Sequence, residues 1–241
     1  LKQWAFDLFS EIVPTLNELI SPRAIALSLL GIAEYNKKIS QDRIVNAIRD
    51  ELINKLKDLY NNNKKKDWLW FEDILAYSNA VMPHALLVTG SIANDSEAIE
   101  IGLESLHWLL EKQVSPTGNF SPISNSFLKY NQTDYYPYDQ QPIESYKTLS
   151  ACLSAYHITN NDFYIEYSYN VFQWFLGKND AGIPLVNLKT GACYDGLSTD
   201  KVNKNCGAES TLAFLLSIAE LKTVEENIIS FDKSSLTLID Q

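Results

Sequence analysis

The sequence predicts an all-α fold of stacked antiparallel helical hairpins, forming an α/α toroid or a partial (α/α)6-like barrel. Three observations predict it. Apolar residues recur at helical spacing along most of the chain. Short polar turns alternate with longer polar connections, and short turns pair neighbouring helices antiparallel. No segment alternates apolar and polar residues for long enough to require a sheet.

The N-terminal part of the chain begins with a bent segment and continues with two helices. Pro14 lies inside the apolar pattern of residues 1–20 and should break it. Ser21 and the proline after it are typical N-cap and first-turn residues of a helix over 22–36. Apolar residues at helical spacing predict the next helix over 44–60, and a polar turn follows it.

The middle of the chain contains two more expected helices. One covers residues 68–89, where Pro83 should kink it by removing a backbone hydrogen bond and Gly90 should stop it. The other covers 96–113, with its leucines and isoleucines on one face. A long polar connection follows from 115 to 142.

The C-terminal part contains a helical hairpin and a last helix. The hairpin joins helices over 144–159 and 162–176 through a two-asparagine turn, and the last helix covers about 209–221. Periodicity fades after Val224, so we expect residues 225–241 to form a weakly structured tail.

Composition indicates one domain and excludes several kinds of partner. The 241 residues are 46% hydrophobic, enough for one large domain or two small ones, and we favour a single all-α domain over 1–241 with residues 1–20 as its N-terminal segment. A formal net charge of -10 repels phosphate backbones and anionic lipid, so we expect neither nucleic acid nor a membrane as a partner. No apolar run is long enough for a transmembrane helix.

Cysteine and histidine usage indicates the compartment and argues against a metal. The three cysteines are an odd number without CxxC spacing, which fits a reduced, cytoplasmic compartment or one incidental pair better than a disulfide framework. The three histidines are not paired at ligand spacing, and no glycine-rich phosphate loop follows a strand. We therefore expect no metal and no cofactor.

The connection between the last two helices is the most informative stretch. Its roughly thirty residues are rich in Gly, Asn and Asp yet carry regular apolar anchors, which indicates an ordered functional loop. If the long connections share one face of the array, they bring four segments together: 70–79, 119–125, 135–144 and 195–209.

Those segments carry carboxylates, amides and aromatic rings. Carboxylates and amides hydrogen-bond hydroxyl groups, and flat rings stack on sugars, so the combination suits a carbohydrate. The candidate catalytic acids are Asp139 and Glu209, followed by Asp73 and Asp195. The candidate substrate-binding residues are Trp70, Glu72, Asn79, Asn125, Tyr136, Gln140, Gln141, Glu144, Asn203 and Asn205.

Several of these residues also have structural explanations. Glu144 follows Pro142 in a first helical turn, where capping explains it as well as catalysis does. Glu72 and Asp73 suit the N-terminus of a helix, because the helix dipole favours acids there. The tryptophans are frequent core residues.

A glycosidase needs one carboxylic acid and one carboxylate, about 5–5.5 Å apart when configuration is retained and about 6.5–9.5 Å apart when it is inverted. The acid needs a raised pKa, which burial among Trp70, Tyr136 and Tyr138 would provide.

Five motifs in order resemble a known family: WFEDILAYSNAVMPHALL, GNFSPISN, YDQQPIES, WFLGKNDAGIPLVNLKTGACYDGL and VNKNCGAESTLAFLL. The chain from about Ser21 to Leu221 resembles the helical domain found beside bacterial family-4-type glycosyltransferases. Cys206 stands where that pattern usually has Gln, and Ala192 where it has Gly. The resemblance implies an α/α toroid, a fold also used by glycan-active epimerases, unsaturated glucuronyl hydrolases and mannanases.

Two functional hypotheses follow. In the first, the chain is a glycan-active enzyme, either like a glycoside hydrolase or part of a glycosyltransferase. In the second, it is a noncatalytic domain that binds an oligosaccharide or packs as a scaffold on a glycosyltransferase catalytic domain. A purely structural scaffold would leave the polar loops unexplained.

Overall fold

The computed structural model describes residues 2–237 and is mostly helical, as the sequence predicts. The chain divides into two compact units. Unit 1 comprises residues 1–112 and 127–135, and unit 2 comprises residues 113–126 and 136–241. The expected single domain over 1–241 stays a prediction.

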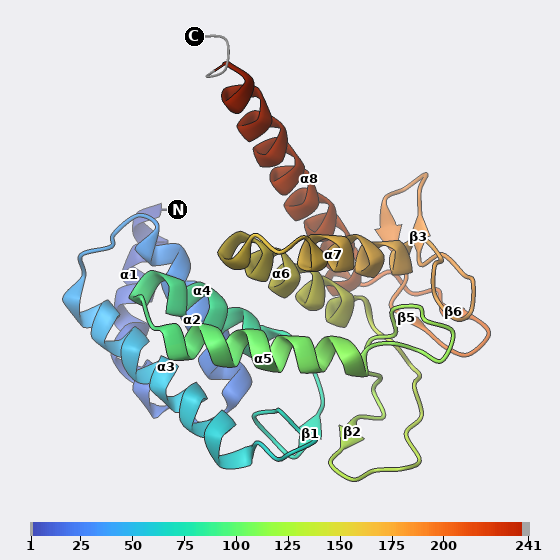
Figure 1. Cartoon of the computed structure of the whole chain (residues 1–241), viewed down its shortest axis with the longest axis horizontal. Coiled ribbons are helices and arrows are strands. Elements are labelled where there is room, and N and C mark those ends of the chain that lie inside the picture. The colour runs from blue at the N-terminus through green and yellow to red at the C-terminus, as the bar shows by residue number, and fades with distance from the viewer. Residues whose placement is uncertain (1, 238–241) are drawn as a thin grey trace. The chain divides into compact units, whose positions relative to one another are not determined.

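Unit 1 consists of packed helices and one short strand pair (Figure 1). Its helices are α1 (Lys2–Ile12), the 3-10 helix η1 (Val13–Glu18), α2 (Pro22–Asn36), α3 (Arg43–Asn63), α4 (Val81–Ala93) and α5 (Ser96–Lys112). The antiparallel strands are β1 (Ile74–Leu75) and β2 (Leu128–Lys129). Helix α2 packs on α3 and α4, and α4 packs along α5. The change from α1 to η1 occurs one residue before Pro14, where we expected the break.

Helix α4 begins later than the sequence predicts. The expected helix from Trp68 is wrong, because residues up to Ala80 form an irregular segment with one short strand. Pro83 lies in the first turn of α4, where its missing N–H has no intrahelical partner to lose, so it does not kink the helix. Gly90 lies inside α4, which ends at Asn94 in the left-handed conformation with φ 56°.

Helix starts are capped differently from the sequence-based expectation. Ser21 occupies the N-cap position of α2, but its side chain makes no capping hydrogen bond. Asp42 caps α3, since its carboxylate accepts hydrogen bonds from the backbone N–H groups of Ile44 at 3.0 Å and Val45 at 3.1 Å.

Unit 2 contains a helical hairpin, a long last helix and two short strand pairs (Figure 1). Its helices are α6 (Pro142–Thr159), α7 (Asp162–Phe175) and α8 (Ala208–Thr237). Its antiparallel strand pairs are β3 (Val186–Asn187) with β4 (Ala192–Cys193), and β5 (Gly196–Leu197) with β6 (Val202–Asn203). Both α7 and α8 pack on α6.

Helix α8 continues past its expected end near Leu221. It runs to Thr237, so residues 225–237 are helical where we expected a weakly structured tail, and 238–241 lie outside the described residues. None of the helices described over 2–237 combines the length and apolar character needed to cross a membrane.

The core of unit 2 joins the helices to the loops between them. Trp174 and Phe175 of α7 are completely buried, and Phe175 packs against Phe214 of α8 with ring centroids 5.5 Å apart. The Trp174 indole Nε1–H donates a hydrogen bond to Oε1 of Gln140, 2.9 Å away. This bond fixes the chain just before α6, which leads to the pocket described next.

Candidate functional site

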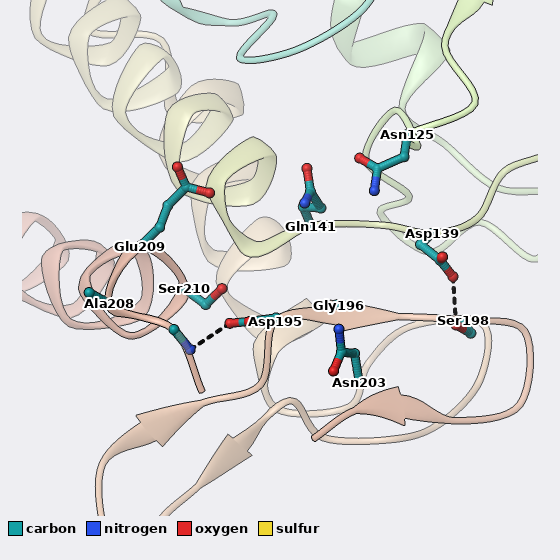
Figure 2. A pocket seen from close by; sticks show the side chains of 11 residues that line it. Asn125, Asp139, Gln141, Asp195, Gly196, Ser198, Asn203, Ala208, Glu209 and Ser210 are labelled. Atoms are coloured by element: carbon teal, nitrogen blue, oxygen red, sulfur yellow. Dashed lines mark hydrogen bonds between the residues drawn. The ribbon is translucent and has the colours of Figure 1, made fainter. Parts of the chain in front are cut away.

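A polar cavity of about 350 Å³ lies in unit 2 at the N-terminus of α8 (Figure 2). That volume is within the range of small-ligand pockets. Four segments supply its lining: Asn125, Asp139, Gln141, Asp195, Gly196, Ser198, Asn203, Gly207, Ala208, Glu209 and Ser210. The pocket therefore forms only when the connections between helices fold together.

One wall of the pocket is a short backbone ladder. The N–H of Gln140 donates to the carbonyl oxygen of Leu197 at 3.0 Å, and the N–H of Leu197 donates back to Gln140 at 2.9 Å. Gly196 allows this approach, because a Cβ atom at that position would lie only 3.1 Å from the carbonyl oxygen of Gln140. The ladder joins the segment before α6 to the β5–β6 hairpin.

Asp139 joins three of the lining segments. Its Oδ1 accepts a hydrogen bond from the hydroxyl of Ser198 at 2.5 Å (Figure 2). Its carbonyl oxygen accepts another from the backbone N–H of Asn125 at 3.0 Å. The side chain itself is exposed at the pocket, so its second carboxylate oxygen can meet a ligand. This exposure differs from the expected burial of the acid among aromatic rings.

Asp195 holds the loop before α8 in place. Its carboxylate accepts hydrogen bonds from the backbone N–H of Gly207 at 2.7 Å and from the Asn205 amide. Its own N–H donates to the carbonyl oxygens of Asn203 at 3.1 Å and Asn205 at 2.9 Å. A Cβ atom on Gly207 would lie 3.0 Å from Oδ1 of Asp195, so a glycine suits that position.

The hydrogen bonds of Asp195 favour its charged form. Burial alone would raise the pKa of this carboxyl, but hydrogen bonds from Asn205, the Gly207 backbone and Ser210 more than offset it. The net result is a pKa below the ordinary value for an aspartate, so Asp195 is a carboxylate near neutral pH.

Glu209 approaches the pocket from the first turn of α8. Figure 2 shows its carboxylate directed towards α6. On α6, burial lowers the pKa of Lys147, while the charges of Glu220, Glu144 and Glu209 act in the opposite direction. Glu220 in turn accepts a hydrogen bond from the hydroxyl of Tyr146 at 3.0 Å. A single lysine thus faces three acids where α6 meets α8.

The structure brings together six of the predicted site residues. These pocket-lining residues are Asn125, Asp139, Gln141, Asp195, Asn203 and Glu209. Asn205 lies next to them through its hydrogen bond to Asp195. The Tyr136 ring is 54% exposed, and its hydroxyl forms a hydrogen bond with the Thr199 hydroxyl at 2.9 Å, beside Ser198 on the same hairpin.

Two further predicted residues of unit 2 do not line the pocket. Gln140 is buried and donates hydrogen bonds to the Ser121 hydroxyl at 2.9 Å and to the carbonyl oxygen of Pro137 at 3.1 Å, in addition to its bond with Trp174. Glu144 is 2% exposed in the first turn of α6. The Gln140 side chain thus supports the segment before α6 from the inside.

The remaining predicted residues belong to unit 1, and none of them lines this pocket. Trp70 is completely buried and stacks on Trp108 with ring centroids 5.7 Å apart, so no ring face is free for a sugar. Glu72 and Asp73 form ion pairs with Arg23 and Lys65. Asn79 closes a turn before α4 by accepting a hydrogen bond from the N–H of Ala76 at 2.9 Å.

Sequence reasoning did not select Ser198 and Ser210, which also line the pocket. Ser210 directly follows Glu209 at a helix start, and this position could have been used to predict that Ser210 lines the pocket. Ser198 lies in a hairpin turn whose pairing with Asp139 depends on folding, so no local pattern identifies it.

Solved structures resemble this chain, although no family model and no curated protein matches it. The GH76A α-1,6-mannanase of Salegentibacter sp. HEL1_6 is 12% identical, with a TM-score of 0.63 over 90% of this chain and 65% of that one. A GH76 α-mannanase of Bacteroides thetaiotaomicron is 10% identical, with a TM-score of 0.61 over 86% and 54%.

A third similar structure contains a glycan. It is an inactive variant of the Salegentibacter enzyme with two consecutive aspartates replaced by asparagine, in complex with α-1,6-mannotriose. It is 14% identical, with a TM-score of 0.62 over 90% of this chain and 65% of that one. These likenesses confirm the all-α toroid fold. The chain spans less than two thirds of the length of each of these mannanases.

Proposed function

We propose that this chain is a carbohydrate-active α/α-toroid domain whose glycan binds in the pocket at the N-terminus of α8. One observation carries the proposal: separate loops and the first turn of α8 place three acidic side chains and three side-chain amides around one cavity. Such groups hydrogen-bond sugar hydroxyls. The mannanases of similar fold, one of them bound to α-1,6-mannotriose, support the same class of ligand.

Within this pocket we assign the acid and base roles to Asp139 and Glu209. Hydrolysis of a glycosidic bond needs two carboxyl groups on different sides of the bond, one to protonate the leaving oxygen and one to act as base or nucleophile. Asp139 and Glu209 come from different segments and are both exposed at the cavity. A bound sugar would exclude water from both side chains.

Asp195 suits a different role. A general acid needs a raised pKa, whereas hydrogen bonds keep the pKa of Asp195 below its ordinary value. We therefore assign Asp195 to anchoring the loop before α8. Asp73 lies in unit 1 in an ion pair with Lys65, and its catalytic role stays a prediction without support from this pocket.

The direct test is turnover of a panel of gluco-, manno- and galacto-oligosaccharides, including α-1,6-mannotriose, with products followed by mass spectrometry. We expect Asp139→Asn or Glu209→Gln to lower turnover by at least about 100-fold, because each removes a proton-transfer group. The matched control is Glu166→Gln, an exposed acid on α7 outside the pocket, which should keep activity. Near wild-type activity in both pocket variants would show that the assignment is wrong.

The alternative is a noncatalytic domain that holds a glycan or packs on a glycosyltransferase. The hydrogen bonds from Ser198 to Asp139 and from Gly207 to Asp195 favour it, because they give both acids a role in fixing loops. It predicts no product from any sugar, together with glycan binding that persists after Glu209→Gln. The association with a glycosyltransferase rests on motif resemblance and is tested by co-purification with such an enzyme.

A further inference from the structure

The charge of the pocket lining is strongly one-sided. Asp139, Asp195 and Glu209 line the cavity, and every other lining residue is an amide, a hydroxyl or a small apolar group. No lysine, arginine or histidine is among the lining residues. Asp195 in particular stays ionised near neutral pH, since its hydrogen bonds favour the charged form.

The charged groups around the pocket do not reverse this sign. Lys147 faces Glu209, but it also faces Glu144 and Glu220, so this cluster keeps an excess of acids. On the β5–β6 side, Lys201 and Lys204 are exposed and do not line the cavity. Acidic and basic residues outside the lining therefore leave the cavity negative.

Resting on the proposed glycan site, we infer that the pocket selects sugars by charge: it prefers an amine-bearing sugar to the neutral sugar of the same shape, and rejects the anionic one. An ammonium group is attracted by the ionised acids of the pocket, while a carboxylate or phosphate placed there has no cation among the lining residues to pair with and meets like charge. The expected substrate class is thus an amino sugar, and uronates and sugar phosphates are excluded.

The exposure of Asp139 and Glu209 sets the size of the effect. Exposed charges are screened by salt within a Debye length of about 10 Å at 0.1 M ionic strength. We therefore expect the amine-bearing sugar to bind roughly tenfold more tightly than its anionic counterpart at low salt, equivalent to about 1.4 kcal/mol. The ratio should fall as salt is added.

The test uses three methyl glycosides that differ only at carbon 6. This carbon carries an ammonium group in the first and a hydroxyl group in the second, and it is the carboxylate carbon in the third. Each set is made in the gluco, manno and galacto configurations. Binding to the full chain labelled with ¹⁵N-glycine is followed by NMR, because the nine glycines include two that line the pocket, Gly196 and Gly207. Gly31 and Gly90, inside α2 and α4, are the reference signals.

The expected result is a shift of Gly196 and Gly207 with affinities in the order ammonium, hydroxyl, carboxylate. The Asp139→Asn variant and a second variant, Glu209→Gln, should reduce the differences in affinity among the three glycosides. Glu166→Gln changes the net charge equally outside the pocket and should leave the order unchanged.

Three results would overturn the inference. If the hydroxyl glycoside binds and the carboxylate glycoside binds as tightly as the ammonium glycoside, the pocket does not select sugars by charge, but the proposed glycan site is still supported. If Glu166→Gln weakens the order as much as the pocket variants do, the preference belongs to the whole surface. If no glycoside shifts the pocket glycines, the glycan site and the charge selection both fail.

Discussion

Asp195 shows how one side chain stabilises the loop that carries the site. Its carboxylate holds the Gly207 N–H and the Asn205 amide, and its pKa lies below the ordinary value of 3.8. Because the folded-state pKa is the lower one, this contribution is present above the unfolded-state pKa. It is lost as the pH falls through the folded-state pKa.

We predict that Asp195→Asn lowers the free energy of unfolding by about 2 kcal/mol at pH 7, since hydrogen bonds to a charged acceptor are lost. Urea unfolding at pH 7 and at a pH below 3 measures the difference. The difference in the free energy of unfolding between wild type and variant should be smaller at the acidic pH. Asp200→Asn, an exposed change of the same charge on the β5–β6 hairpin, is the control. A gap that is equal at both pH values would contradict the linkage.

The sequence identified most pocket side chains but not their direction. Asp139 and Gln141 line the cavity, while Gln140 between them bonds to Trp174 in the core. Successive side chains of an extended segment point to opposite sides, so one of three adjacent polar residues had to face inwards. Trp70 lies in an irregular segment where a helix was expected, and its ring is buried, because local sequence does not show what packs over such a segment.

The helices themselves were easier to predict than the boundaries between loops and helices. Helix α2 matches its expected range, and α6 and α7 match within two residues, because their apolar spacing and their Pro, Asn and Asp boundary residues agree. The start of α4 was predicted too early, because the apolar side chains from Trp68 to Leu75 do not form the buried face of a helix. The aromatic rings of this segment pack as a cluster instead, with the Trp68 and Trp108 ring centroids 4.9 Å apart.

The turn between α6 and α7 offers a test at the level of one element. Asn160 ends α6 in the left-handed conformation with φ 51°, and its N–H donates to the carbonyl oxygen of Tyr156 at 2.8 Å. We predict that Asn160→Ala lowers the free energy of unfolding by about 1 kcal/mol, whereas Asn160→Gly leaves it unchanged or raises it slightly. The urea midpoints of the two variants measure this. Equal losses in both would implicate the Asn side chain instead.

At the scale of the whole molecule, the open question is whether the two compact units unfold together. We predict a single cooperative transition, as expected for one domain over 1–241. Hydrogen exchange followed by mass spectrometry in rising urea reports on α3 in unit 1 and α7 in unit 2 separately. Coincident midpoints would support one domain. Two separated midpoints would show two independently folding units.

The fold class followed from helical periodicity, and the similar mannanase structures confirm it. The long extension of α8 did not follow, because its C-terminal part lacks the apolar spacing on which the prediction relied. The pocket was predicted only in part. Long polar connections indicated which segments carry it, while the pairing of Asp139 with Ser198 needed the structure.

The pocket is built almost entirely from connections, and this has an evolutionary consequence. Only Ala208, Glu209 and Ser210 of its lining residues belong to a helix, while α6 and α7 supply the buried core beneath it. Substitutions at the pocket-lining Ser198 and Asn203 can therefore alter the ligand while Leu197 and Val202 of the same hairpin keep their core packing. Related chains can diverge in the sugars they recognise while keeping one scaffold, and a library randomised over residues 198–201 and 203, with Val202 kept in the core, would sample that divergence directly.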